Sequence, residues 1–164
     1  MVVIRGIPDV KAADMADMRI LKVKYQLDET SELLNKFSME FDPPLSSRVD
    51  IKAYAEKLSR YANFLIAEEQ NRVIGYLAFY KNQNAMELYI TSLCVSNTYR
   101  GKGIGKKLLD HLCNIGLSEG YPSISLEVRK NNKNAFGFYK KMQFEISQTR
   151  SETILMNKRI SSCE

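Results

Sequence analysis

The feature that most constrains this chain is a run of alternate glycines between an apolar segment and an amphipathic one. Glycines stand at positions 101, 103 and 105, shortly after the apolar residues 93–95, and from Ile104 onward apolar residues recur at helical spacing. Such a turn between a strand and a helix points several backbone N–H groups toward one spot, at the positive end of the helix dipole. Glycine also lets an anion approach the main chain without an intervening Cβ. The segment therefore predicts an anion-binding turn.

Two better-known phosphate-binding motifs do not match this turn. A P-loop has four residues between its first glycine and its Gly-Lys pair, whereas Gly101 and Gly105 are separated by three. Lys107 also stands where a P-loop has its hydroxyl residue. The dinucleotide pattern G-x-G-x-x-G fails because Lys106 and Leu108 occupy the positions of its last glycine. A simpler interpretation of the segment remains a solvated, lysine-rich helix start with flexible glycines.

The composition is that of a globular domain. The chain has 164 residues, of which 45% are apolar and 26% charged. No apolar run approaches the roughly 20 residues that a membrane span needs, and the N-terminus lacks the segments of a signal peptide. We therefore expect a cytoplasmic protein without a membrane partner, in which residues 1–17 form an extension of uncertain structure and residues 18–160 a single domain.

Cysteine, histidine and charge narrow the chemistry. Cys94, Cys113 and Cys163 are an odd set without the spacing of metal ligands, so we expect reduced thiols. A single histidine, His111, leaves little for a metal centre or a histidine-based triad, and we predict no metal. The net charge of +5 favours anionic ligands. The lysines concentrate at the glycine turn without interleaved aromatic residues, so we do not expect a nucleic-acid partner.

The periodicity of apolar residues predicts a mixed α/β sheet. Asp28 is expected to cap the first helix and Asp50 the second, and residues 41–48, with two prolines, are predicted to be a loop without regular structure. Val2–Ile7 is a candidate short strand; the other expected elements are a strand in 18–26, helices 29–37 and 50–61, strands 63–68, 73–80 and 85–95, a helix from the glycine turn to about 116, a strand 123–128, a helix 133–142, and strands 144–147 and 153–156. The strand–helix–strand crossover predicts a pair of parallel strands.

A second motif follows about 30 residues after the glycine turn. Its residues have the spacing N-x-x-A-x-x-F-Y-x-K-x-x-F and are Asn132, Ala135, Phe138, Tyr139, Lys141 and Phe144. Together with Arg100, Gly103 and Gly105 in the pattern R-x-x-G-x-G, this motif resembles the GCN5-related N-acetyltransferase (GNAT) family over residues 62–157. Gln143 departs from the pattern, since the family usually has glycine there. The resemblance implies a GNAT-like mixed central sheet of about seven strands with flanking helices, its parallel strands splayed around the cofactor.

The resemblance also implies acetyl-CoA as the cofactor and assigns residues to it. The backbone of the strand before the turn would pair with the pantetheine arm and supply an N–H group to the oxyanion. Asn132 would shape the cofactor side of the last crossover helix, and Lys141 would reach a phosphate. The implied pantetheine residues are Leu93, Cys94 and Val95, and the implied pyrophosphate residues are Arg100, Gly101, Lys102, Gly103, Ile104, Gly105 and Lys106.

Two residues are candidates for proton transfer. Tyr139 is implied as the general acid, because a phenol with a pKa of about 10 can donate to a thiolate whose thiol has a pKa of about 8.5 at modest cost. The alternative is that Tyr139 only packs beside Phe136 and Phe138. Glu87 is a candidate general base through a water, two residues before Tyr89, where some family members carry a glutamate; a glutamate at a strand end is more often merely solvated.

The resemblance places the acceptor beside the first two helices and their loop. Phe41, Asp42 and Arg48 are therefore predicted to bind the acceptor, with Asp42 holding an ammonium or Arg48 a carboxylate or phosphate; both are also compatible with purely local roles. The predicted function is direct transfer of an acetyl group to a small-molecule primary amine by a monomer or homodimer, with Cys94 packing rather than forming an acyl-enzyme. The alternatives are a protein N-terminal or lysine acetyltransferase and a non-catalytic acyl-CoA-binding module.

Overall fold

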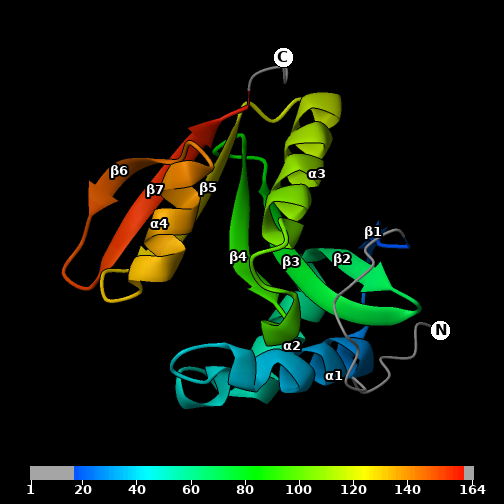
Figure 1. The fold of residues 1–164 in the computed structure, drawn as a ribbon. Coiled ribbons are helices and arrows are strands. Elements are labelled where there is room, and N and C mark those ends of the chain that lie inside the picture. The colour runs from blue at the N-terminus through cyan, green and yellow to red at the C-terminus, as the bar shows by residue number, and fades with distance from the viewer. Residues whose placement is uncertain (1–16, 161–164) are drawn as a thin grey trace. The chain divides into compact units, whose positions relative to one another are not determined.

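A computed structural model describes residues 17–160, so the candidate strand at Val2–Ile7 lies outside the described residues. Within that range the strands form one seven-stranded sheet in the order β1-β2-β3-β4-β5-β7-β6, with flanking helices, and the predicted fold class is confirmed (Figure 1). In chain order the elements are β1 (Arg19–Val23), α1 (Leu27–Phe37), the 3-10 turns η1 (Ser38–Glu40) and η2 (Leu45–Ser47), α2 (Ile51–Tyr61), β2 (Asn63–Glu69), β3 (Arg72–Asn82), β4 (Glu87–Val95), the 3-10 turn η3 (Asn97–Tyr99), α3 (Ile104–Glu119), β5 (Ser123–Arg129), α4 (Lys133–Lys141), β6 (Glu145–Thr149) and β7 (Thr153–Arg159).

The described chain divides into two compact units. The first consists of residues 17–78 and 92–109, and the second of residues 79–91 and 110–160. The first unit therefore holds β1, β2, α1, α2 and the glycine turn, and the second holds β5, α4, β6 and β7. Strands β3 and β4 and helix α3 contribute residues to both units.

Helix α1 of the first unit begins at Leu27, one residue before Asp28, which was expected to cap it. Its N-cap is Gln26, whose backbone N–H donates to Glu29 Oε2 at 2.8 Å, while Asp28 lies inside the first turn. The prediction that Asp28 caps the helix was therefore wrong, because a reciprocal bond between N-cap and N3 satisfies a free N–H even when the cap is not one of the favoured residues. Leu33 and Phe37 bury the apolar face of the helix.

Helix α2 lies beside α1 (Figure 1) and begins as predicted. Asp50 is its N-cap, and the carboxylate accepts a hydrogen bond from the Ala53 N–H at 3.0 Å. The loop between the two helices is more regular than expected. The η2 turn begins directly after Pro44, whose carbonyl accepts from the Ser47 N–H at 3.0 Å. Proline removes a donor but keeps its acceptor, so the prediction of no regular structure was wrong for residues 45–47.

The hairpins of the sheet depend on left-handed residues that the sequence did not single out. Gln70 and Asn71 have φ of 49° and 61° and form the two-residue turn between β2 and β3. Two positive φ angles suit the right-handed twist of the flanking strands. Met86, with φ of 51°, ends the next turn, so β4 begins at Glu87 rather than at residue 85.

The predicted parallel pair of strands lies in the second unit. Strand β4 pairs in parallel with β5, in a register that runs from Glu87 with Ser123 to Ile90 with Leu126. Strand β7 pairs antiparallel with both β5 and β6, and α4 lies against β5 (Figure 1). After α4, Gln143 has φ of 68° at the position where glycine is usual in the family. The unusual residue therefore adopts the backbone that glycine normally provides, at a steric cost.

We expect Gly75→Ala to lower the melting temperature by a few degrees. A Cβ built on Gly75 lies 3.1 Å from the Cys94 carbonyl oxygen and 3.4 Å from Val95 Cγ2, so β3 or the end of β4 must move to accommodate it. About 1 kcal/mol corresponds to roughly 2–4 °C in a chain of this size. The matched control is Gly137→Ala inside α4, where a Cβ meets no heavy atom within 4 Å and alanine should stabilise the helix. Equal shifts in a thermal melt would contradict the close approach.

Candidate cofactor and catalytic site

Helix α3 begins at the glycine turn of the first unit, as the sequence predicts. Gly101 and Gly103 have φ of 77° and 79°, a region that favours glycine. The Lys107 N–H donates to the Gly103 carbonyl at 3.0 Å, which makes this bond the first of helix α3. The N–H groups of residues 104–106 precede that bond, so the helix itself offers them no acceptor. The turn can therefore donate several hydrogen bonds to one anion.

Arg100 braces the segment that leads into this turn. Its Nε donates to the Val95 carbonyl at 3.1 Å, and its Nη2 donates to the Glu40 carbonyl at 2.5 Å. Nη2 also lies 3.4 Å from Glu40 Oε2. The backbone N–H of Arg100 donates to the Asn97 carbonyl at 3.3 Å. Both the side chain and the N–H of Arg100 thus hold the segment before the turn.

Glu40 is a site residue that the sequence analysis missed. Besides its contacts with Arg100, its Oε2 accepts a hydrogen bond from the Asn97 N–H at 3.0 Å. Asn97 and Arg100 are 57 and 60 residues away in the chain. No local pattern around Glu40 signals a partner at such a separation.

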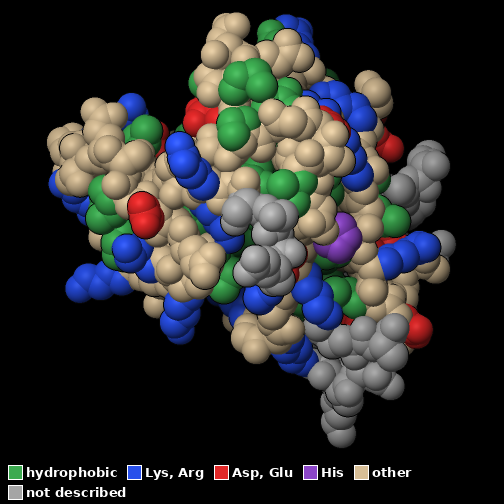
Figure 2. All heavy atoms as spheres, turned by 90° about the horizontal axis from the view of Figure 1, so that it is seen from above, with side chains coloured by type: hydrophobic (Ala, Val, Ile, Leu, Met, Phe, Trp, Pro, Cys, Tyr) green, Lys and Arg blue, Asp and Glu red, His purple; other side chains and the backbone are tan. Residues whose placement is uncertain are grey.

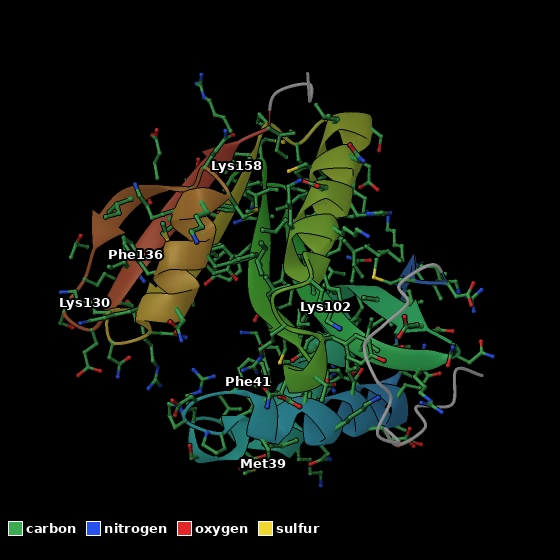
Figure 3. The ribbon with its side chains drawn as sticks, in the orientation of Figure 1. Met39, Phe41, Lys102, Lys130, Phe136 and Lys158 are labelled. Carbon is green, nitrogen blue, oxygen red and sulfur yellow. The ribbon has the colours of Figure 1, made fainter. Side chains whose placement is uncertain are left out.

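Tyr99 anchors the turn on its other side. The side chain is buried, and burial together with a hydrogen bond to Glu69 raises the pKa of its phenol. Glu69 is itself buried at the end of β2. Lys102, labelled on the turn in Figure 3, places its Nζ 5.7 Å from the centroid of the Tyr99 ring. The ring therefore supports both the backbone and one cation of the turn.

Cys94, near the end of β4, carries a neutral thiol. Only 5% of the residue is exposed. Burial raises the pKa of the Cys94 thiol to about 12, while the neighbouring Arg100 guanidinium acts in the opposite direction. Because the thiolate is the nucleophilic form, Cys94 is unreactive near neutral pH. Cys113 is also buried and outside any disulfide.

Two of the three predicted acceptor residues lie together in the first unit. The Arg48 guanidinium lies 5.3 Å from the centroid of the Phe41 ring, and both residues are half-buried. Arg48 also lowers the pKa of Cys94, which places its positive charge near the end of β4. Asp42 is exposed. In Figure 3 Met39 points to the opposite side of this segment from Phe41, and it is 78% exposed.

Tyr139 of the second unit is buried in an aromatic cluster. Its ring makes edge-to-face contacts with Phe138 at 5.2 Å and Phe144 at 5.4 Å between centroids. Phe144 thus packs against the ring in addition to Phe138, and Phe136 lies on the same helix, α4 (Figure 3). Asn132 caps α4, since its Oδ1 accepts from the Ala135 N–H at 3.1 Å. Lys141, also predicted to contact the cofactor, is exposed in the last turn of the same helix.

Tyr89 and two carboxylates form a second cluster in this unit. The Tyr89 ring stacks on Tyr80 with centroids 6.4 Å apart. Burial raises the pKa of Tyr89, and the charges of Glu127 and Glu87 raise it further. Glu127 accepts hydrogen bonds from Arg150 at 3.3 Å and from the Thr153 hydroxyl. The sequence analysis missed Glu127, although strand alternation from Ser125, the register partner of Tyr89, could have indicated its face.

Other kinds of site find no support in residues 17–160. No group of three His, Cys, Asp or Glu side chains there is arranged to hold a metal ion. His111 is exposed, as the purple side chain in Figure 2 shows. Among the helices of the same range, none has the length and apolar character needed to cross a bilayer.

The raised pKa of Cys94 predicts how the rate at which this thiol is alkylated changes with pH. In the folded protein we expect the rate of Cys94 alkylation by iodoacetamide to rise about tenfold per pH unit from pH 7.5 to 9.5, because the thiolate fraction grows throughout a range below about 12. In urea the rate should level off near pH 9, since a free thiol has a pKa of about 8.5. Peptide mass spectrometry follows each cysteine separately. A native rate that levels off at the same pH as the unfolded rate would contradict the assignment.

Comparisons with known proteins agree with this geometry. The chain is 41% identical to N-alpha-acetyltransferase 50 of Danio rerio over 70 residues, 42% of each protein. It is 39% identical to the probable N-acetyltransferase san of Drosophila melanogaster over 71 residues, 43% of this chain and 39% of that one. The chain thus matches about two-fifths of the length of these relatives.

The fold is also that of solved acetyltransferases. The structure of the PaiA N-acetyltransferase from Thermoplasma acidophilum in complex with coenzyme A matches with a TM-score of 0.70, covering 86% of this chain and 99% of that one at 21% identity. A sequence model of the acetyltransferase (GNAT) family matches residues 27–144. Since this match spans most of the chain and includes the glycine turn, the chain belongs to the acetyltransferase (GNAT) family.

Proposed function

We propose that this acetyltransferase moves the acetyl group of acetyl-CoA directly to the primary amine of a small molecule, with the glycine turn as the pyrophosphate site. The observation that carries the proposal is the open main chain at Gly101 and Gly103, next to the first N–H groups of α3, for which the helix itself has no acceptor. A Cβ built on either glycine meets no heavy atom within 4 Å, so the space beside the main chain is open to an anion. The coenzyme A in the PaiA complex supports the same class of donor for this chain.

The proposed pyrophosphate site uses fewer residues than the sequence suggested. The N–H groups of residues 101–106 bind the pyrophosphate, and Lys102 and Lys106 add positive charge. Arg100 instead holds the turn to Val95 and Glu40. The backbone of residues 93–95 receives the pantetheine arm, and when bound the thioester supplies the activated acetyl group.

Tyr139 is the proposed general acid, and its packing suits that role. Phe138 and Phe144 contact the ring edge-to-face and hold it in a single orientation, so the hydroxyl has a fixed direction. A phenol can give its proton to a departing thiolate at modest cost.

For the general base we propose Glu87, acting through a water. Both oxygens of Glu127 already accept hydrogen bonds from Arg150, and one also accepts from Thr153. Glu87 is half-buried and lies two residues before Tyr89 on the same strand, and its charge raises the pKa of the Tyr89 phenol. Its task is to take the proton that an ammonium must lose before it attacks.

Acetyl-CoA should raise the melting temperature of the protein, because a ligand that binds only the folded state stabilises it by mass action. Gly103→Glu should abolish that shift, since it puts a carboxylate at the proposed pyrophosphate position. The matched control is Gly120→Glu, which adds the same charge at a glycine with φ of 80° at the far end of α3. If Gly103→Glu folds and retains the shift, the turn is not the pyrophosphate site.

Tyr139→Phe should reduce turnover by about 10²-fold or more, the usual size of a lost general acid. The substitution keeps the ring and its contacts with Phe138 and Phe144, so affinity for coenzyme A should stay within about twofold. Thiol release from acetyl-CoA measures turnover, and calorimetry measures affinity. Unchanged turnover would reduce Tyr139 to a packing residue.

A second candidate acceptor is the N-terminal amine of a peptide. It is favoured by the name of the Danio rerio relative, N-alpha-acetyltransferase 50, to which this chain is 41% identical over 70 residues. Thiol release across a panel of small amines and short peptides, each peptide in free and N-terminally blocked form, separates the two. Turnover of free peptides alone would replace the small-molecule proposal.

A further inference from the structure

Glu40 stands between the two functional parts of the first unit. It ends η1 and immediately precedes Phe41, the first residue of the predicted acceptor loop, residues 41–48. Its carbonyl and its carboxylate both accept hydrogen bonds from the segment that leads into the glycine turn, from Arg100 Nη2 and from the Asn97 N–H. One residue therefore fastens the start of the acceptor loop to the start of the donor turn.

The acceptor loop behind Glu40 is internally braced. The Ser46 N–H donates to Ser38 Oγ at 3.2 Å, which closes the loop across its base. Inside the loop, the N–H groups of Ser47 and Arg48 donate to the carbonyls of Pro44 and Leu45, each at 3.0 Å. Because these hydrogen bonds connect the loop residues, holding or releasing the first residue affects the order of the whole loop.

The turn side of the connection is equally direct. The same Arg100 that donates to Glu40 also donates through Nε to the Val95 carbonyl, at the end of β4. Asn97 lies in η3, which leads into the turn, and the chain from Asn97 to Gly103 contains no α-helix. An anion held by the N–H groups after this segment restricts the backbone that Glu40 contacts.

We propose that Glu40 is a positioning residue through which coenzyme A on the glycine turn orders the acceptor loop, residues 41–48. The inference rests on the proposed function, because it takes the turn as the site of the pyrophosphate. Restricting the turn stabilises Asn97 and Arg100 in their present places, and both then hold Glu40. Occupation of the glycine turn thus orders the acceptor loop, and the rate of local opening in the loop measures this coupling.

Hydrogen exchange measured by mass spectrometry, with coenzyme A as the probe, tests this coupling. In the wild type we expect coenzyme A to slow exchange in peptides covering residues 100–107 and also in those covering residues 38–48, the latter about fivefold or more. Glu40→Ala should keep the slowing at residues 100–107 and lose it at residues 38–48. Glu40→Gln should restore most of the slowing, since its amide oxygen can still accept from the Asn97 N–H.

A matched control and a second variant complete the test. Glu32→Ala removes an exposed carboxylate from α1, and it should leave both sets of peptides as in the wild type. Arg100→Lys keeps the charge but cannot donate to Glu40 and Val95 at once, and it should uncouple the loop as Glu40→Ala does. If Glu40→Ala does not fold, Arg100→Lys decides the question.

The outcomes separate the inference from the function on which it rests. If coenzyme A changes neither the melting temperature of the wild type nor the hydrogen exchange of residues 100–107, the proposed donor site itself is overturned. A wild type that binds coenzyme A while residues 38–48 exchange at an unchanged rate overturns the coupling alone. Slowing at residues 38–48 that survives in both Glu40→Ala and Arg100→Lys also overturns it, because the loop is then ordered by another route.

Discussion

The first unit depends on a backbone constraint at Gly101 and Gly103. Their left-handed φ angles lead the chain into α3, whose first N–H groups have no acceptor in the helix itself. For these groups to bind an anion, as proposed, the surrounding residues must hold the turn without occupying it. Tyr99 does so through its hydrogen bond to Glu69, and Gly75 does so by letting β3 approach the Cys94 carbonyl.

Charge contributes to this site in a less obvious way than the sequence suggests. Arg100 belongs to the glycine motif, yet its guanidinium is committed to Val95 and Glu40. The side chains of this pair are 50% and 22% exposed, so the ion pair has modest strength and its value lies in geometry. In the proposed donor site the anion is therefore met mainly by backbone dipoles, which need no reorganisation, and by lysines such as Lys102, whose Nζ lies over the Tyr99 ring. Such a site needs little added charge, which is consistent with a net charge of only +5.

Features set by neighbours in the chain were predictable from the sequence, and features set by distant partners were not. The Asp50 cap, the glycine turn and the parallel crossover follow from spacing within one element or from one element to the next. The Gln26 cap departed from the local rule because a reciprocal bond with Glu29 replaced the favoured residue. The contacts of Glu40 and Glu127 come from residues 57 to 60 and 23 to 26 positions away, so they become visible only in the folded chain.

The alternatives stated for Tyr139, packing or catalysis, are compatible once the geometry is considered. A general acid must hold its proton in one direction, and an aromatic side chain with two torsions is fixed when its ring is held. Phe138 and Phe144 provide that hold through edge-to-face contacts, and Asn132 fixes the start of the helix that carries the residue. Gln143, directly before Phe144, adopts a left-handed conformation that costs stability, and this turn lets the Phe144 N–H donate to the Tyr139 carbonyl at 3.0 Å. The strained turn at Gln143 therefore brings Phe144 back against the Tyr139 ring, whose hydroxyl is the proposed proton donor.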